Sequence, residues 1–440
     1  MTHTLPARGE FVLRGAFVLT MDPAQGDIDG GDVHVRDGEI VAVGRDIPAP
    51  GIRAIDARAM IALPGFVDTH WHLWNTALRA LVRGDDPQHG YFPVTLKYGP
   101  LCDPDDAEHS VRLGLAEAVA AGITTVHDWS HNVRSPAHAE AELRALRASG
   151  LRARFSCGWG QDLPLTQPMD LALLTRLRDE WDDAEGLLTL GAAVRTPVAN
   201  PRGAVPIDVL LRECAAIRAL GLPLTMHARP GIVALLDQHG LLGPDLQLIH
   251  PQGVSADECA RLAATRTHFS CSPVIEVHYA QFARGEIQFR ELQDAGVAQS
   301  LSVDSSAASA NADFFTCMRV LLWSHKQRFG AAVPLPPRRL LALATIDGAR
   351  DLGLDHLTGS LTPGKRADVI LVRTTDVNMA PVRDPAHALV YSAQTCNIDT
   401  VVADGRILLA GGTFTALDHE RVVRAADASI RALQARAEGA

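Results

Sequence analysis

The chain has 440 residues, enough for about three ordinary domains or for one large α/β barrel with an additional domain. Hydrophobic residues make up 47% of it and charged residues 21%, which excludes a wholly disordered or collagen-like protein. Forty-one basic residues against 51 acidic ones give a net charge of −10, so we expect neither nucleic acid nor an anionic membrane surface as a partner.

The sequence also lacks patterns for export and membrane insertion. MTHTLPARGE lacks the basic start and apolar block of a secretion signal, and no run approaches the roughly 18 apolar residues of a membrane span. We therefore expect a cytoplasmic protein. The seven cysteines are scattered and never spaced as CxxC, which predicts buried thiols rather than disulfides or a thiolate metal site.

Both ends of the chain share a β-rich pattern. Near the N-terminus, the runs FVLRGAFVLT, DVHVRDGEIVAVG and IRAIDARAMIALPG predict short strands, with Asp37-Gly38 as a hairpin turn. The runs ADVILVRT and VVADGRILLAGG show the same texture near the C-terminus, with Asp404-Gly405 as a second hairpin turn. We expect the two segments to pair as one small β-sandwich.

Between these segments, apolar runs alternate with helical stretches. The runs are GFVDTHWH, ITTVHDW, RARFSCGW, LLTLGAAVR, LPLTMHA, LQLIHPQ, THFSCSPV and VAQSLSVDS. One intervening helix is predicted over 104–121, with Asp103 as N-cap and Gly122 past its end, and another over about 206–220, stopping at Gly221. Eight strands alternating with helices predict an α/β protein with a (β/α)₈ barrel. The expected units are the N-terminal half of the β-sandwich over 1–63, the barrel over 64–357, the C-terminal half of the sandwich over 358–415 and a terminal helix over 416–440.

Five polar side chains fall at the C-terminal ends of predicted barrel strands. His70 and His72 end the first strand, His227 the fifth, His250 the sixth and Asp304 the eighth. Barrels present their chemistry on this face, and residues i and i+2 of a strand point the same way. About 0.7 HxH pairs are expected by chance, and Asp304 could also cap a helix, so the convergence is the stronger argument. Neutral imidazoles with one carboxylate suit zinc or ferrous iron.

These motifs resemble those of the amidohydrolase superfamily. The likeness is carried by LPGFVDTHWH (63–72), TMH (225–227), LIH (248–250), SVDS (302–305) and GSLTPGKRADVILV (359–372), and it spans nearly the whole chain. The most similar branch contains cytosine, S-adenosylhomocysteine and triazine deaminases and dechlorinases, and it shares the segment GITTVHD (122–128). The resemblance implies that His250 stands near the metal and the substrate, and that the ligands of a single ion are His70, His72, His227 and Asp304.

One metal ion per chain is expected rather than two. Two-metal relatives usually bridge their ions with a carboxylated lysine at the end of strand four. The three lysines of this chain, Lys97, Lys326 and Lys365, lie elsewhere, and LLTLGAAVR contains no carboxylate. We expect zinc, with ferrous iron as the alternative.

The expected chemistry is hydrolysis by water that the metal activates, with Asp304 moving the proton and His250 stabilising developing negative charge. In the resembled branch, a glutamate follows the strand-five histidine by three positions and passes protons to a ring nitrogen. Here that position is Pro230. We expect Glu276, just beyond strand seven, to act as the substitute acid or base; the alternative is an ordinary solvated loop glutamate.

The substrate is expected to be small and planar. A loop of about thirty residues after the first strand is rich in aromatic residues, and tryptophans follow several early strands. The candidate contacts are Trp74, Trp159, His127 and Arg229; Arg229 could pair with a substrate carboxylate. Core packing, or a surface ion pair for Arg229, is the competing explanation.

The sequence thus favours a hydrolase that cleaves a C–N bond of a small, ring-containing molecule, by deamination or a related hydrolysis. Two alternatives stay open. One is an amide or lactam hydrolase, or a non-hydrolytic lyase, that uses the same metal site. The other is a catalytically inactive protein that binds a metal and a ligand. A homo-oligomer is compatible with a barrel of this size.

Overall fold

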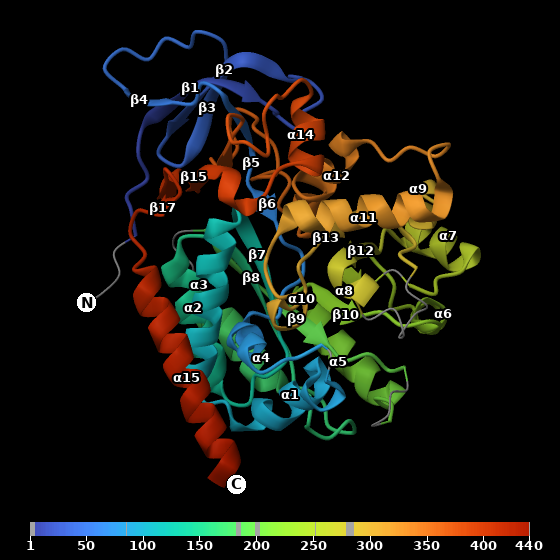
Figure 1. Ribbon diagram of the computed structural model, residues 1–440. Helices are drawn as coiled ribbons and strands as arrows, with labels where there is room; N and C mark the ends of the chain where they lie inside the picture. The colour runs from blue at the N-terminus through green and yellow to red at the C-terminus, as the bar shows by residue number, and fades with distance from the viewer. Residues whose placement is uncertain are drawn as a thin grey trace.

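Eight parallel strands form the centre of the computed structural model, which describes residues 5–84, 86–181, 186–198, 203–250, 252–278 and 286–439 (Figure 1). The strands pair in chain order: β6 (Phe66–Val67), β7 (Ile123–Ser130), β8 (Arg152–Cys157), β9 (Leu188–Val194), β10 (Leu224–His227), β11 (Leu246–Ile249), β12 (His268–Cys271) and β13 (Gln299–Leu301). Each of the eight predicted runs contains one of them. The predicted (β/α)₈ barrel is therefore confirmed.

The barrel closes between the segments that follow β6 and β13, although β6 itself has only two residues. The amide of His72 donates to the carbonyl of Asp304 at 2.8 Å, and the amide of Asp304 donates to the carbonyl of His70, also at 2.8 Å. Trp71 and Asp304 form a parallel bridge there. The backbone bonds that close the barrel thus belong to predicted metal ligands.

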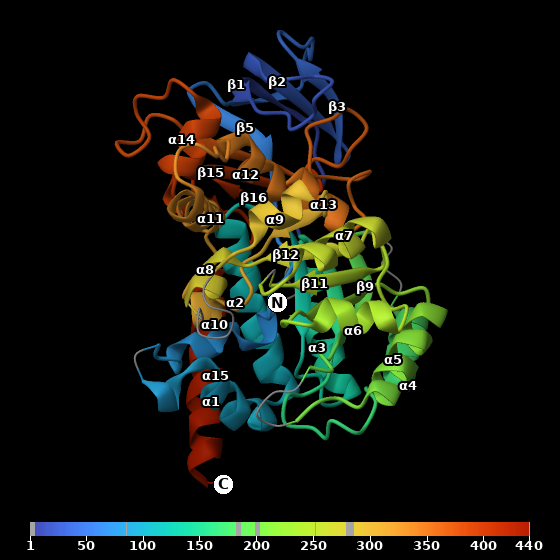
Figure 2. The same ribbon diagram turned by 90° about the vertical axis from the view of Figure 1, so that its right-hand side faces the viewer.

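Helices surround the strands (Figures 1 and 2). The longer ones are α2 (Pro104–Ala120), α3 (Pro136–Ser149), α4 (Leu171–Glu180), α5 (Ile207–Ala219), α7 (Ala256–Thr265) and α11 (Phe314–Phe329). The shorter ones are α1 (Tyr91–Tyr98), α6 (Ile232–Gln238), α8 (Pro273–His278), α9 (Phe289–Asp294), α10 (Ser306–Ser309), α12 (Pro337–Leu343), α13 (Ile346–Asp351) and α14 (Pro385–Tyr391). Short 3₁₀ turns are η1 (Leu73–Ala80), η2 (Pro87–His89), η3 (Gly99–Leu101) and η5 (Thr395–Asn397). The two helices predicted from capping signals are confirmed as α2 and α5, and Asp103 caps α2 by accepting from the amide of Asp106.

The two chain ends share a second sheet of nine strands, at the top of Figure 1. The N-terminal segment supplies β1 (Phe11–Val18), β2 (Ile28–Arg36), β3 (Glu39–Gly44), β4 (Arg53–Asp56) and β5 (Met60–Pro64). The C-terminal segment supplies β14 (Val369–Arg373), β15 (Ile398–Ala403), β16 (Arg406–Ala410) and β17 (Thr413–Phe414). The order is β17-β16-β15-β14-β5-β1-β2-β3, with β4 beside β1, and the antiparallel β5–β14 pair joins the ends. The predicted pairing of the two segments is confirmed.

Alternation along the joining strands separates two cores. In β5, Ile61 and Leu63 belong to the cluster that includes the barrel interior, whereas Ala62 faces a second cluster within the small sheet. In β14, Ile370 packs with the barrel and Val369 with the small sheet. Because successive side chains of a strand point to opposite faces, these two strands attach the small sheet to the barrel.

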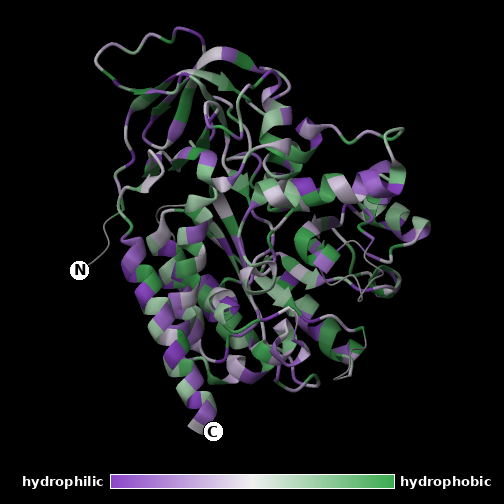
Figure 3. Cartoon of the chain, viewed as in Figure 1, coloured by the Kyte–Doolittle hydropathy of each residue, from purple (hydrophilic) through white to green (hydrophobic). Residues whose placement is uncertain are grey.

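The terminal helix α15 (His419–Gly439) lies along α2, as Figure 1 shows, and Figure 3 shows its hydrophilic and hydrophobic residues intermixed along its length. Its Ile430 and Leu433 pack in one cluster with Trp74, Tyr91 and Val94. The helix predicted for this segment therefore supports the wall formed by η1 and α1.

The seven cysteines are all free thiols. Six are buried, as predicted, and Cys396 in η5 is the exposed exception, because that short turn lies at the surface. Within the described residues, no helix is long and apolar enough to cross a bilayer.

A pair of buried carboxyl groups lies between β7 and α3. Asp128 accepts from the amide of Leu73 at 3.3 Å, and Glu142 accepts from the hydroxyl of Ser130 at 2.9 Å. Burial raises the pKa of Asp128 to about 8, and burial together with the charge of Asp128 raises the pKa of Glu142. The pair therefore retains a proton at neutral pH.

This proton predicts a pH dependence of stability. An unfolded aspartate releases its proton near pH 3.9, whereas folded Asp128 holds it to about pH 8. The protonated carboxyl group stabilises the folded protein fully below the unfolded pKa, and this stabilisation is lost as the pH rises through the folded pKa. The free energy of unfolding falls by up to about 1.4 kcal/mol per pH unit in this range. We expect Asp128→Asn to flatten this decline in urea unfolding between pH 5 and 9, whereas the exposed α7 variant Asp257→Asn does not; equal slopes for all three proteins would contradict this assignment.

Candidate metal centre

Three imidazoles and one carboxylate converge at the C-terminal rim of the barrel. His70 and His72 follow β6, His227 ends β10 and Asp304 follows β13. The Nε2 atoms of His70 and His227 are 3.3 Å apart, and the Oδ1 of Asp304 lies 3.4 Å from the Nε2 of both His70 and His72. One nitrogen from each of the three histidines lies within 4.8 Å of the other two. This donor set matches that of a zinc or ferrous site.

The protonation states of these histidines suit metal binding. The Nδ1 of His72 lies 2.8 Å from the carbonyl of Trp129 and must donate to it, so its Nε2 presents a lone pair to the centre. Burial lowers the pKa of His72 to about 3, and burial with neighbouring imidazoles lowers the pKa of His70 and His227 well below the ordinary value. Neutral imidazoles facing one point fit a divalent ion.

Two residues of the centre have left-handed backbone. His250 has φ 69° and Asp304 has φ 68°, a region that non-glycine residues seldom adopt and that costs about 1 to 3 kcal/mol each. Backbone hydrogen bonds hold both, because the amide of His250 donates to the carbonyl of Ser270 and that of Asp304 donates to the carbonyl of His70. The helix-cap alternative for Asp304 is not observed, since Ser305 occupies the N-cap of α10.

A chain of three side chains extends from the centre. The Nε2 of His250 lies 3.4 Å from the Oδ2 of Asp304, and its Nδ1 lies 3.3 Å from the Oε1 of Glu276. Burial lowers the pKa of His250, but the hydrogen bond to Glu276 and the charge of Asp304 outweigh it, so the pKa is raised.

Glu276 lies in α8 and is 2% exposed, so it is not the solvated loop glutamate of the alternative. Its Oε1 also accepts from the amide of Ser272 at 2.8 Å, and its Oε2 accepts from the thiol of Cys271 at 3.1 Å. Both carboxylate oxygens therefore have protein partners, and the group that faces the centre from this side is His250.

A cavity of about 630 Å³ opens on the centre. Its lining includes His72, His227, His250, Glu276 and Asp304. Much of the remaining wall is apolar or aromatic, from residues such as Tyr91, Phe92, Trp129, Leu163 and Val194. This volume and this lining suit a small planar molecule.

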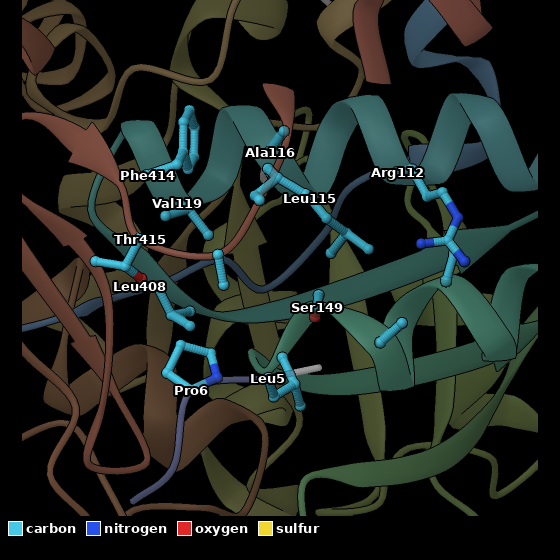
Figure 4. A pocket seen from close by; sticks show the side chains of 14 residues that line it. Leu5, Pro6, Arg112, Leu115, Ala116, Val119, Ser149, Leu408, Phe414 and Thr415 are labelled. Atoms are coloured by element: carbon cyan, nitrogen blue, oxygen red, sulfur yellow. The ribbon is translucent and has the colours of Figure 1, made fainter. Parts of the chain in front are cut away.

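A second hollow lies away from the centre, between the N-terminal segment, α2, α3 and the β16–β17 region (Figure 4). Its volume is about 50 Å³, and its walls are mostly apolar, with Leu5, Leu115 and Phe414 among them. Arg112 is the only charged side chain among its described lining residues. It therefore offers neither the size nor the ligand groups of the large cavity.

The four predicted substrate contacts divide into two pairs. Trp159 and Arg229 line the cavity. Trp74 and His127 are not among its described lining residues, and both make internal hydrogen bonds. The indole of Trp74 donates to Nδ1 of His131, at 3.1 Å, while the His127 ring nitrogens lie 2.8 Å from the Thr69 carbonyl and 2.7 Å from the Ser156 hydroxyl.

Arg195 is a cavity residue that the sequence patterns did not single out. It ends the fourth predicted strand, so the end-of-strand rule that selected the histidines also applies to it. Its guanidinium lies over the ring of Trp159 and forms an ion pair at 3.1 Å with Glu213, which is 1% exposed. His131, which directly follows β7, also lines the cavity and accepts from the indole of Trp74.

Comparison with known proteins places this geometry in a family. The model of the amidohydrolase family matches residues 61–408. A 5'-deoxyadenosine deaminase of Methanosarcina acetivorans is 29% identical over 455 residues, covering 97% of this chain and 99% of that protein. A 5-methylthioadenosine/S-adenosylhomocysteine deaminase of Moorella thermoacetica is 30% identical over 430 residues, covering 92% and 95% respectively.

Solved structures show the same fold. An atrazine chlorohydrolase of Arthrobacter aurescens TC1, complexed with zinc, has a TM-score of 0.82 at 22% identity, covering 96% of this chain and all of that one. An adenosine deaminase of Xanthomonas campestris with bound zinc has a TM-score of 0.83 at 22% identity, covering 98% and 100%. The resemblance seen in the motifs and the expected hydrolase class are confirmed, and the chain belongs to the amidohydrolase family.

Proposed function

We propose that this protein is a mononuclear metal-dependent deaminase that replaces an amino group on a small heteroaromatic ring with oxygen and releases ammonia. The observation that carries the proposal is the convergence of three neutral imidazoles and Asp304 at one end of a large, aromatic-lined cavity. The deaminases that match almost the full length of the chain support it, because their names specify amino-substituted purine nucleosides as substrates.

In this proposal His70, His72, His227 and Asp304 hold one zinc ion, with ferrous iron as the alternative. A divalent ion at this site supplies a Lewis acid that makes water nucleophilic at neutral pH. The chain's own contribution is to keep the imidazoles neutral by burial and to fix the ring of His72 through the carbonyl of Trp129.

Asp304 is suited to moving the proton. Its Oδ1 faces the metal-binding nitrogens and its Oδ2 faces His250, so one carboxylate touches both the ligand set and the substrate side of the cavity. In the proposed reaction, it accepts a proton from the attacking water and delivers it to the departing amino group. His250, which lies between Glu276 and Asp304, donates a hydrogen bond to the attacking oxygen in this scheme.

Glu276 acts through His250 in this scheme. Because both its oxygens have protein partners, it is a positioning residue that orients the imidazole and raises the pKa of His250. Pro230 cannot transfer a proton, so in this scheme Asp304 and His250 do so, and Glu276 orients His250. This differs from direct ring protonation by Glu276, the role expected from the sequence.

The primary test combines metal analysis with an assay for ammonia. The purified protein, loaded with zinc or with ferrous iron, is incubated with 5'-deoxyadenosine, adenosine, cytosine and aminotriazines. We expect about one ion per chain, ammonia release from at least one aminated ring, and loss of activity on chelation that metal restores. Metal binding without ammonia release from any aminated ring would contradict deamination, and absence of bound metal would contradict the centre itself.

Replacing Asp304 should abolish turnover. Asp304→Asn removes both an anionic ligand and the proton carrier, so we expect ammonia release to fall by at least about 1000-fold, together with reduced metal affinity. The control Asp257→Asn changes the charge equally on the exposed surface of α7 and should retain full activity. An Asp304→Asn protein with unchanged turnover would rule out this role.

Replacing Glu276 should separate positioning from binding. Glu276→Gln keeps the size of the side chain but removes its charge from His250, so we expect kcat to fall about 10- to 100-fold. We expect KM and metal content to stay within about twofold, and Glu276→Asp to recover part of kcat. The exposed Glu286→Gln is the control. A raised KM with unchanged kcat would show instead that Glu276 binds substrate.

A further inference from the structure

Arg229 is a cation that no protein group neutralises among the residues that the structure describes. It lies two residues beyond His227, lines the large cavity and is half-buried. Among the described residues, no carboxylate lies within ion-pair distance of it, and its guanidinium makes no hydrogen bond to them. A guanidinium that is partly removed from water and has no partner destabilises the folded protein. An unpaired arginine in a cavity wall therefore points to a ligand that pairs with it.

The other charged groups of the cavity wall are engaged. Apart from Arg229 and the histidines, the charged residues among the described lining residues are Arg195, Glu276 and Asp304. Arg195 pairs with the buried Glu213, Glu276 bonds His250, and Asp304 faces the histidines. Arg229 is therefore the one arginine among the described lining residues whose charge no protein carboxylate offsets. Its charge is close enough to oppose protonation of His250.

The backbone holds Arg229 in place from both sides. The amide of Ala228 donates to the carbonyl of Ile249 at 2.8 Å, and the carbonyl of Arg229 accepts from the amide of Ile232 at 3.0 Å. Pro230 follows with its restricted φ and packs against Gly253, where a Cβ would lie 2.6 Å from the proline ring. These contacts fix the point at which the Arg229 side chain leaves the backbone in the cavity wall.

The polar groups that line the same cavity as Arg229 favour a carboxylate on a planar ring. One guanidinium presents a planar pair of donors that matches one carboxylate. The buried indole nitrogen of Trp159 and the amide oxygen of Gln161 also have no protein partner among the described residues, and both residues line the cavity. They offer one neutral donor and one neutral acceptor, a combination that suits the edge of a heteroaromatic ring rather than a second anion.

We propose that Arg229 forms an anion subsite and that the substrate class is an amino-substituted heteroaromatic ring that carries a carboxylate. Arg229 lies in the cavity wall on the segment that follows β10, two residues after His227. In this proposal the carboxylate binds at Arg229 while the amino-substituted carbon faces the candidate metal centre. This substrate assignment rests on the proposed deaminase function, whereas the anion subsite itself is open to a direct binding test.

The test uses two planar probes that differ in one group, indole-3-carboxylate and indole-3-carboxamide. Isothermal titration calorimetry with the zinc-loaded protein should show the carboxylate binding at least about 10-fold more tightly than the carboxamide, equivalent to about 1.4 kcal/mol. Arg229→Gln should bring the two affinities within about twofold. Arg229→Lys, which keeps the charge but loses the paired donors, should retain some of the preference.

Two controls isolate the effect of Arg229. Arg266→Gln removes an exposed positive charge outside the cavity and should bind both probes as the unaltered protein does. Metal-free protein, prepared with a chelator, should keep the preference, because a carboxylate that bound the ion instead would lose it. The preference should weaken as salt is raised.

The outcomes separate this inference from the proposed function. Equal affinities for the two probes, a preference that survives Arg229→Gln, a preference that disappears with the metal, or no binding of the carboxylate at millimolar concentration would each overturn the anion subsite. Ammonia release from neutral rings with no Arg229 dependence would support the deaminase and reject the substrate class. A carboxylate preference that depends on Arg229, without ammonia release from any amine, would support the subsite and reject the deaminase.

Discussion

The metal centre and the closure of the barrel depend on the same backbone hydrogen bonds. Asp304 both accepts from the amide of His72 and donates to the carbonyl of His70. These two bonds set the spacing of one carboxylate and two imidazoles before any ion binds. The left-handed backbone of Asp304 is the cost of this arrangement, and these two backbone bonds hold it in place. The geometry of the candidate ligands therefore derives from barrel closure.

Burial then determines what these side chains can do. Imidazoles deep in the barrel rim stay neutral, and neutral imidazoles offer the lone pairs that a divalent ion requires. His250 has the same side chain but two carboxylate neighbours, and these raise its pKa instead of lowering it. In the proposed reaction, one residue type would thus serve as ligand at three positions and as hydrogen-bond donor at a fourth, and Glu276 and Asp304 set the difference.

Much of this arrangement follows from sequence patterns, and some of it cannot. The period of apolar runs gives eight strands, and the rule that barrel chemistry lies at strand ends gives His227 and Asp304. That rule does not show whether a side chain reaches the cavity or is buried behind its wall. His127 lies within β7 rather than past its end, so its ring points among internal hydroxyl and carbonyl groups. Trp74 is not among the described lining residues of the cavity, because its indole donates to His131, which is one of them. These outcomes depend on packing between elements distant in sequence.

Pro230 shows how one position bears on the charge of the cavity. A glutamate at position 230 would place a carboxylate one residue from Arg229 and offset its charge. Proline removes that carboxylate, fixes the turn that carries Arg229 and leaves the guanidinium open to a ligand. Proton transfer then falls to Asp304 and to His250 with its buried partner Glu276. The absence of an acid at position 230 and the unneutralised arginine beside it are thus linked, and both agree with the proposed anionic substrate.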